Sequence, residues 1–176
     1  NRKPNIAWVV VDSVRSYSGA NDSRDFLEIF YKLSLKGTRF FNVQTSAPST
    51  IMSTSAMLSG IDSVNHAITY DDFCASNNGI RYLKDELSPR GYNIYLITFF
   101  PEGFKFLGDV FDGLTSRKSK KSPSESRFWS NSEITIVLKD LINKKVIKEP
   151  FLLYLNYNCR NDPNTGGEVE KGINYI

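Results

Sequence analysis

The chain has 176 residues, of which 40% are hydrophobic, and its 22 basic and 19 acidic side chains give a formal net charge of +3. This composition is typical of one globular domain with its own core, and it excludes a chain that is disordered throughout. The charge excess is too small for the dense basic face of most nucleic-acid-binding domains, and no apolar run approaches the roughly 20 residues that span a bilayer.

The few histidines and cysteines restrict the chemistry of the chain. There is one histidine, His66, and there are two cysteines, Cys74 and Cys159. A single imidazole makes a histidine-rich zinc site or a Ser-His-Asp triad hard to build. Two cysteines allow one disulfide without implying a disulfide framework, and we expect no catalytic role for either. The cellular compartment stays open.

The first half of the chain predicts two strands and two helices. The β-branched run 6–11, Ile-Ala-Trp-Val-Val-Val, predicts a strand buried on both faces, and it is followed by Asp12. A helical pattern runs from 23 to a stop at Gly37, and residues 38–44 predict the second strand. A loop rich in Ser and Thr then leads to a short helix over 53–59 that Gly60 ends.

The second half continues the alternation of helices and strands. We expect helices over 79–87, 130–145 and 168–176 and strands over 93–100 and 151–157. This order predicts an α/β fold with a mostly parallel sheet flanked by helices on both faces. The basic, serine-rich stretch between the third strand and the helix at 130 has no interleaved aromatic residues, which is typical of a solvated loop.

Two polar segments come directly after predicted strands, where such folds place their ligands. The carboxylate of Asp12, at the end of a buried strand, suits a hard divalent cation, but it could equally cap the next turn or helix. A hydroxyl in 45–53, at the start of a helix, would lie near unpaired backbone N–H groups that favour a phosphate or sulfate ester. The plainer interpretation of that segment is a loop with a capping Ser or Thr.

Together the two segments resemble the sulfatase family of the alkaline phosphatase superfamily. The opening PNIAWVVVDSVR is similar to the family's first strand, which delivers a metal-binding Asp, here Asp12. The stretch TSAPSTIMSTSAMLSG resembles its nucleophile motif and places Thr50 in the nucleophile position. The segments GIDSVNHAI, RYLKDELSPRGYNIYLIT and PFLLYLNYN resemble later segments of the family's core. The resemblance runs from Pro4 to the end, with specific motifs only in the first 68 residues.

The resemblance implies an alkaline-phosphatase-like fold and a hydrolase or transferase that acts on sulfate or phosphate esters. Thr50 would be the catalytic nucleophile, and a divalent ion (Ca²⁺, Mn²⁺, Mg²⁺ or Zn²⁺) would bind Asp12 and Thr50. The expected partner is an anionic ester, with no nucleic acid and no membrane segment in this chain. For His66 we favour a structural or exposed role, and Arg15 either contacts the substrate or pairs with an acid.

Several positions differ from the family pattern. Thr50 stands where sulfatases have a Cys or Ser that is converted to formylglycine, which favours phosphoryl chemistry or a lost activity. Met52 replaces a Pro, and Thr54 replaces an Arg. Ser13 follows Asp12, where many members have a second acid.

Two further groups expected from the family have no match in the sequence. The segment 156–163 holds Asn156, Asn158 and Asn161 where the family has a substrate-contacting histidine. The downstream Asp-His pair of metal ligands matches nothing in these residues. We therefore expect residues 1–176 to be the N-terminal portion of a sulfatase-like catalytic domain, with its C-terminal part missing.

Two other interpretations stay open. The chain could be a catalytically inactive sulfatase-like remnant that serves as a binding or interaction module. It could also be an unrelated doubly wound domain that binds a phosphorylated small molecule, in which case we expect the first strand at an edge of the sheet. The enzymatic interpretation makes one spatial prediction: the Asp12 carboxylate and the Thr50 hydroxyl lie within a few ångströms of each other, on a shared cation.

Overall fold

The computed structural model describes residues 2–13, 31–38, 40, 42–65, 79–98, 130–158 and 165–176, with side chains in the last stretch from 168 on. The expected helix over 23–37 is described only from 31, and residues 31–34 are helical. The expected loops between 99 and 129 lie outside the described residues.

Three strands form an all-parallel sheet in the order β1-β3-β2. The strands are β1 (Ile6–Asp12), β2 (Asn93–Thr98) and β3 (Phe151–Asn158). The predicted α/β fold with a parallel sheet is therefore confirmed. Within the described sheet β1 lies at one edge, as the small-molecule-binding interpretation expects. Its residues are half-buried or exposed, so the prediction that the run 6–11 is buried on both faces is wrong.

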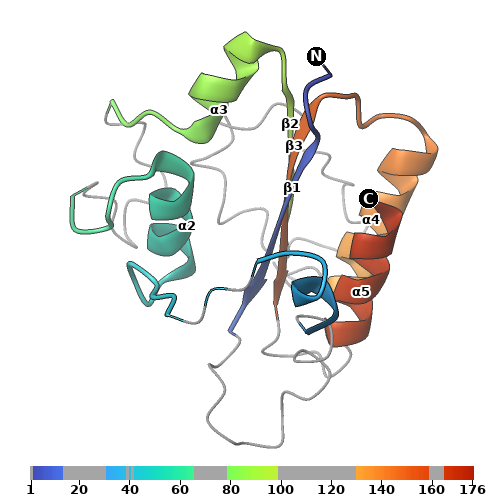
Figure 1. Ribbon diagram of the computed structural model, residues 1–176, viewed down its shortest axis with the longest axis horizontal. Coiled ribbons are helices and arrows are strands. Elements are labelled where there is room, and N and C mark those ends of the chain that lie inside the picture. Colours follow the sequence, from blue (N-terminus) through green and yellow to red (C-terminus); the bar gives the residue numbers. More distant parts are fainter. Residues whose placement is uncertain are drawn as a thin grey trace, which may run out of the picture.

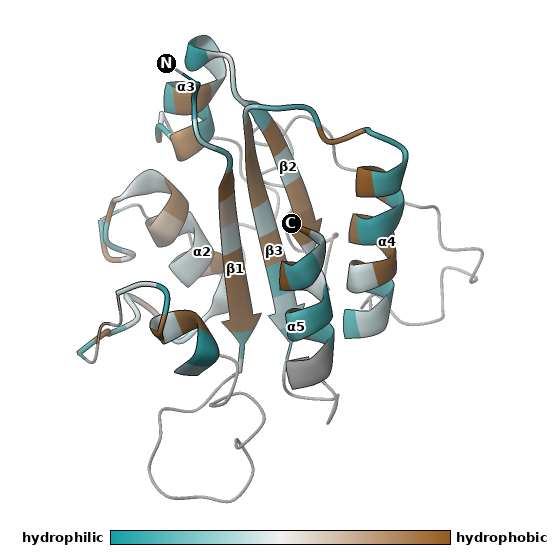
Figure 2. Cartoon of the chain, turned by 45° about the vertical axis from the view of Figure 1, so that its right-hand side comes forward, coloured by the Kyte–Doolittle hydropathy of each residue, from teal (hydrophilic) through white to brown (hydrophobic). Residues whose placement is uncertain are grey.

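Helices cover both faces of this sheet, as the sequence predicts (Figure 1). On one face lie α2 (Thr50–Ser59) and α3 (Leu83–Leu87), which continues into the 3₁₀ turn η2 (Ser88–Arg90). On the other lie α4 (Asn131–Asn143) and α5 (Thr165–Tyr175). Figure 2 shows mostly hydrophobic strands beside helices that carry hydrophilic residues as well.

Strand β3 divides the core into two parts because its side chains alternate between the faces. Leu153, Leu155 and Tyr157 pack with residues of α4 and α5, whereas Leu152 and Tyr154 pack toward α2 and α3. All five side chains are buried. The middle strand of the described sheet is thus fixed from both sides, and its carboxyl end has a defined position.

The ends of the helices follow local signals only in part. Gly60, with φ +70°, ends α2 as predicted, but α2 begins at Thr50 rather than at 53, because the extended backbone of Ser49 already starts the helix. α3 begins at Leu83 rather than at 79. At this start, the Asp85 carboxylate accepts a hydrogen bond from the Tyr82 N–H at 2.8 Å. α5 begins at 165, three residues before its predicted start.

The predicted strand over 38–44 is wrong for the residues that the structure describes. Residues 38, 40 and 42–44 adopt no strand. Phe40 and Val43 are 76% and 75% exposed, so their strand-forming side chains are not packed as a sheet would require.

A helix that crosses a membrane must be both long and apolar. Within the described ranges, none combines the length and the apolarity that a bilayer-spanning helix needs.

Candidate functional site

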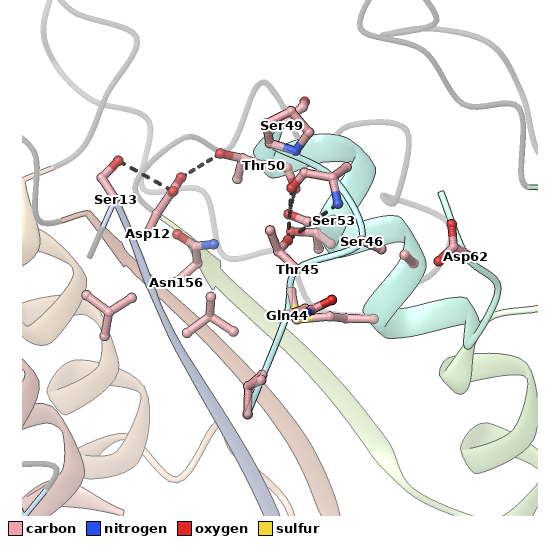
Figure 3. Close-up of a pocket in the computed structure, with 18 of the residues that line it drawn as sticks. Asp12, Ser13, Gln44, Thr45, Ser46, Ser49, Thr50, Ser53, Asp62 and Asn156 are labelled. Carbon is pink, nitrogen blue, oxygen red and sulfur yellow. Dashed lines mark hydrogen bonds between the residues drawn. The ribbon is translucent and has the colours of Figure 1, made fainter. Parts of the chain in front are cut away.

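The two residues singled out by the sequence meet at the carboxyl end of β1. The Thr50 hydroxyl donates a hydrogen bond of 2.6 Å to Oδ2 of Asp12 (Figure 3). This distance lies within the range of charge-assisted O–H···O⁻ hydrogen bonds. Ser13, whose φ is +65°, offers a longer contact of 3.5 Å to the other carboxylate oxygen. The expected proximity of carboxylate and hydroxyl is thus present.

Their meeting follows from the local structure of both segments. Strand β1 holds Asp12 rigidly through its pairing with Asn158 of β3. Thr50 is the first residue of α2, and the N-terminal end of a helix favours negative charge. The helix therefore presents both a hydroxyl and a favourable dipole to the Asp12 carboxylate.

The pair lines a pocket of about 830 Å³ between β1, α2 and the loop that precedes α2. Ser49, Asp62 and Asn156 also line it, together with apolar side chains such as Val10 and Met57. Figure 3 shows Asp62 away from Thr50, on the far side of α2. Among the described residues, Asp12 is thus the carboxylate at the Thr50 hydroxyl.

A buried polar layer lies beneath Asp12. Asn156 is 0% exposed, and its Nδ2 donates to the Tyr154 hydroxyl at 3.5 Å, the long limit for a hydrogen bond. The Tyr154 hydroxyl also lies 3.4 Å from the Thr54 hydroxyl. Burial raises the pKa of Tyr154, so this phenol stays neutral. The Nδ2 atom of Asn156 is therefore hydrogen-bonded to an uncharged partner.

Within the part of the chain that the structure describes, the other amide atom of Asn156, Oδ1, has no hydrogen-bond partner. Among the described residues, Asn156 Oδ1 and Ser49 Oγ are buried polar atoms of this pocket that make no hydrogen bond. A buried acceptor without a donor costs about 1–3 kcal/mol. The sequence pointed to Asn156 only as part of a segment that lacks a histidine. The signal that could have identified it is a polar side chain that interrupts an apolar strand.

Asn158 has a structural role at the end of β3. Its N–H donates to Oδ1 of Asn131 at 2.9 Å, and its carbonyl accepts from Nδ2 of Asn131 at 2.7 Å. The amide of Asn131, at the start of α4, thus holds the strand end that pairs with Asp12.

The remaining sequence candidates fall into two groups. Thr54, which stands where the family has an Arg, is buried and contacts Tyr154. The others lie outside the described residues, namely Arg15, His66, Cys74, Cys159 and Asn161.

The possible metal-ligand atoms of the site are oxygens, which is the donor type that hard cations prefer. The described residues contain no group of three or more His, Cys, Asp or Glu side chains that could hold a metal ion. They do bring together a carboxylate, a hydroxyl and an unpartnered buried amide oxygen, and oxygen donors of this kind suit Ca²⁺, Mg²⁺ or Mn²⁺. A scan against protein-family models and a search of the curated proteins found no match to the chain.

Proposed function

We propose that the protein is a metal-dependent hydrolase or transferase of phosphate or sulfate esters, with an alkaline-phosphatase-like fold and Thr50 as its nucleophile. The observation that carries the proposal is the 2.6 Å hydrogen bond between Thr50 and Asp12, which are 38 residues apart in sequence. Open α/β sheets bind their ligands beyond the carboxyl ends of the strands, where this pair lies.

The two side chains have complementary tasks. Asp12 orients the Thr50 hydroxyl and accepts its proton as Oγ1 attacks the phosphorus or sulfur atom. The bond from Thr50 Oγ1 to that atom forms while the bond to the ester's alcohol breaks, and the leaving oxygen takes up the proton that Asp12 accepted. Water or a second alcohol then attacks the Thr50 ester, and its proton passes through Asp12 to Thr50 Oγ1 as the ester bond breaks, which restores the hydroxyl. A divalent ion on Asp12 and Thr50 would lower the pKa of the hydroxyl and offset the ester's charge.

Phosphate esters are the favoured substrates. The resemblance assigns Thr50 to a position that sulfatases fill with a Cys or Ser precursor of formylglycine, and threonine is not such a precursor. An unmodified hydroxyl suits phosphoryl transfer. The N-terminus of α2, whose first residue is Thr50, favours the anionic group of either ester.

A catalytically inactive binding module is the second candidate. It is favoured by the single carboxylate that the described residues place at Thr50, because a divalent cation needs about six oxygen ligands. A binding module without a metal would show no rise in melting temperature with Mn²⁺, Ca²⁺ or Zn²⁺, whereas a cation that binds the folded state raises it by mass action.

Replacing the nucleophile tests the enzymatic proposal directly. In the full chain, Thr50→Ala should lower kcat/KM on p-nitrophenyl phosphate, bis-p-nitrophenyl phosphate or p-nitrophenyl sulfate by at least about a thousandfold. The circular dichroism spectrum should not change, because Thr50 is a helix-terminal residue and alanine is compatible with a helix. Thr38→Ala, the same change at an exposed threonine, is the matched control.

Mass spectrometry adds an independent test of the covalent step. After rapid acid quenching, the peptide with Thr50 should carry one added phosphoryl or sulfuryl group, and the Thr50→Ala protein should carry none. Full turnover by Thr50→Ala on every ester that the unaltered protein cleaves would refute the assignment.

A further inference from the structure

The unpartnered amide oxygen of Asn156 is the strongest unexplained feature of the described residues. Asn156 is fully buried, its Oδ1 has no hydrogen-bond partner among these residues, and it lines the same pocket as Asp12 and Thr50. A buried polar atom without a partner is unfavourable unless a ligand satisfies it. The proposed nucleophile chemistry does not use this oxygen.

The register of the sheet places Asn156 on the same face as Asp12. Asn156 pairs with Val10 of β1, and Asp12 lies two residues further along that strand. Because side chains two residues apart point the same way, both leave the sheet toward α2. Figure 3 shows the Asn156 amide beneath the Asp12 carboxylate. Two ligands of one Ca²⁺ ion, each at 2.3–2.6 Å, can lie up to about 5 Å apart.

The contact with Tyr154 determines which amide atom is available. Nδ2 of Asn156 points to the Tyr154 hydroxyl, whose oxygen lies 3.5 Å away and can accept its hydrogen bond. Oδ1 is left as an acceptor in the pocket that Asp12, with its two acceptor oxygens, also lines. Such a pair repels the oxygens of an anionic ester and attracts a cation.

We propose that Asn156 Oδ1 is a third oxygen ligand, with Asp12 and Thr50, of one divalent cation. The inference rests on the cation of the proposed function, but not on Thr50 as a nucleophile. It predicts a site that prefers hard cations, because all three donors are oxygens.

Calorimetric titration of the metal-free full chain with Mn²⁺, together with thermal melting in the presence of EDTA, tests the ligand role. Asn156→Leu should weaken Mn²⁺ binding about tenfold or more and leave the metal-free melting temperature unchanged or higher, because the orphaned oxygen is removed. Asn156→Asp should bind Mn²⁺ more tightly but melt at a lower temperature without metal, because its carboxylate repels that of Asp12.

Tyr157→Phe is the matched control, since this neighbour on β3 faces α4 and α5 instead of the pocket. Its Mn²⁺ affinity should equal that of the unaltered protein. Mn²⁺ affinity unchanged in both Asn156 variants would overturn the inference and leave Thr50 as a nucleophile standing. No Mn²⁺ binding by the unaltered protein would overturn both the ligand role and the cation. Should Asn156→Leu fail to fold, the Mn²⁺ affinity of Asn156→Asp alone decides.

Discussion

The two faces of β3 differ in whether the polar groups near its carboxyl end are hydrogen-bonded. On the face toward α4 and α5, Leu153, Leu155 and Tyr157 keep the strand apolar to its end. At that end the amide of Asn131, in α4, makes two hydrogen bonds to the backbone of Asn158. On the face toward α2, the apolar pattern stops and Asn156 keeps an unpartnered oxygen.

This difference indicates that one face of the strand supports the structure of the site and the other face binds the ligand. A site needs side chains that are held by satisfied neighbours, and it needs polar atoms that are left for a ligand. The α4–α5 face supplies the first, because its packing and hydrogen bonds fix the carboxyl end of the strand. The α2 face supplies the second. If this division is correct, substitutions on the first face should reduce stability, and those on the second should reduce binding.

We expect the largest effect on stability from a substitution on the face of β3 toward α4 and α5, where α5 approaches the strand closely at Gly172. A Cβ at this position would lie 2.2 Å from the Tyr157 hydroxyl oxygen and 3.2 Å from Cζ. Gly172→Ala should therefore lower the free energy of unfolding by about 3 kcal/mol, as measured by urea denaturation. Adding Tyr157→Phe removes the closest atom and should recover part of the loss. An unchanged urea midpoint in the single variant would show that the two elements are not packed this tightly.

The next largest effect is the difference in stability between the same substitution at two buried asparagines, Asn131 and Asn156. Asn131→Leu removes both part-buried hydrogen bonds to the Asn158 backbone, so we expect a loss of about 2 kcal/mol in the free energy of unfolding. Asn156→Leu, the same change on the other face, should cost nothing in metal-free protein. Urea denaturation of the two variants in EDTA measures both effects. Equal losses would contradict the division between the faces.

Much of the supporting framework was predictable from the sequence. The run 6–11 is long and β-branched enough to indicate a strand, but the predicted burial on both faces is wrong, because β1 lies at an edge of the described sheet and none of its residues is fully buried. The sequence of α4 combines helical spacing with a Ser130–Glu133 capping pair. Prediction from local sequence failed where the secondary structure depends on pairing with a distant segment. In the predicted strand 38–44, Phe40 and Val43 have side chains typical of strands, but strand formation also requires a neighbouring strand to pair with, which the sequence does not reveal.

The candidate site was predictable to the same limited degree. The rule that parallel strands present their carboxyl ends to ligands, with the family resemblance, indicated that Asp12 and Thr50 would meet, and they do. The role of Asn156 could not be read in this way. It depends on the register that sets Asn156 opposite Val10, and on the Tyr154 hydroxyl that turns the amide. Neither leaves a pattern in the sequence.

The smallest expected effect compares the N-termini of α2 and α4, which lie on opposite faces of the sheet. The Ser130 hydroxyl accepts a hydrogen bond from the Glu133 N–H at 3.3 Å, whereas the Ser49 hydroxyl makes no capping bond and is buried without a partner among the described residues. Ser130→Ala should therefore cost about 1 kcal/mol in the free energy of unfolding, as is usual for a lost cap. Ser49→Ala should cost close to nothing.

Urea denaturation without metal or anion measures both serine variants, and each controls for the other because the substitution is the same. A loss from Ser49→Ala as large as that from Ser130→Ala would mean that the α2 terminus is stabilised by its own serine. In that case the N-terminus of α2 would be an ordinary capped helix start. A loss confined to Ser130→Ala would mean that the start of α2 is left uncapped next to the Asp12 carboxylate, as a terminus that receives an anionic group requires.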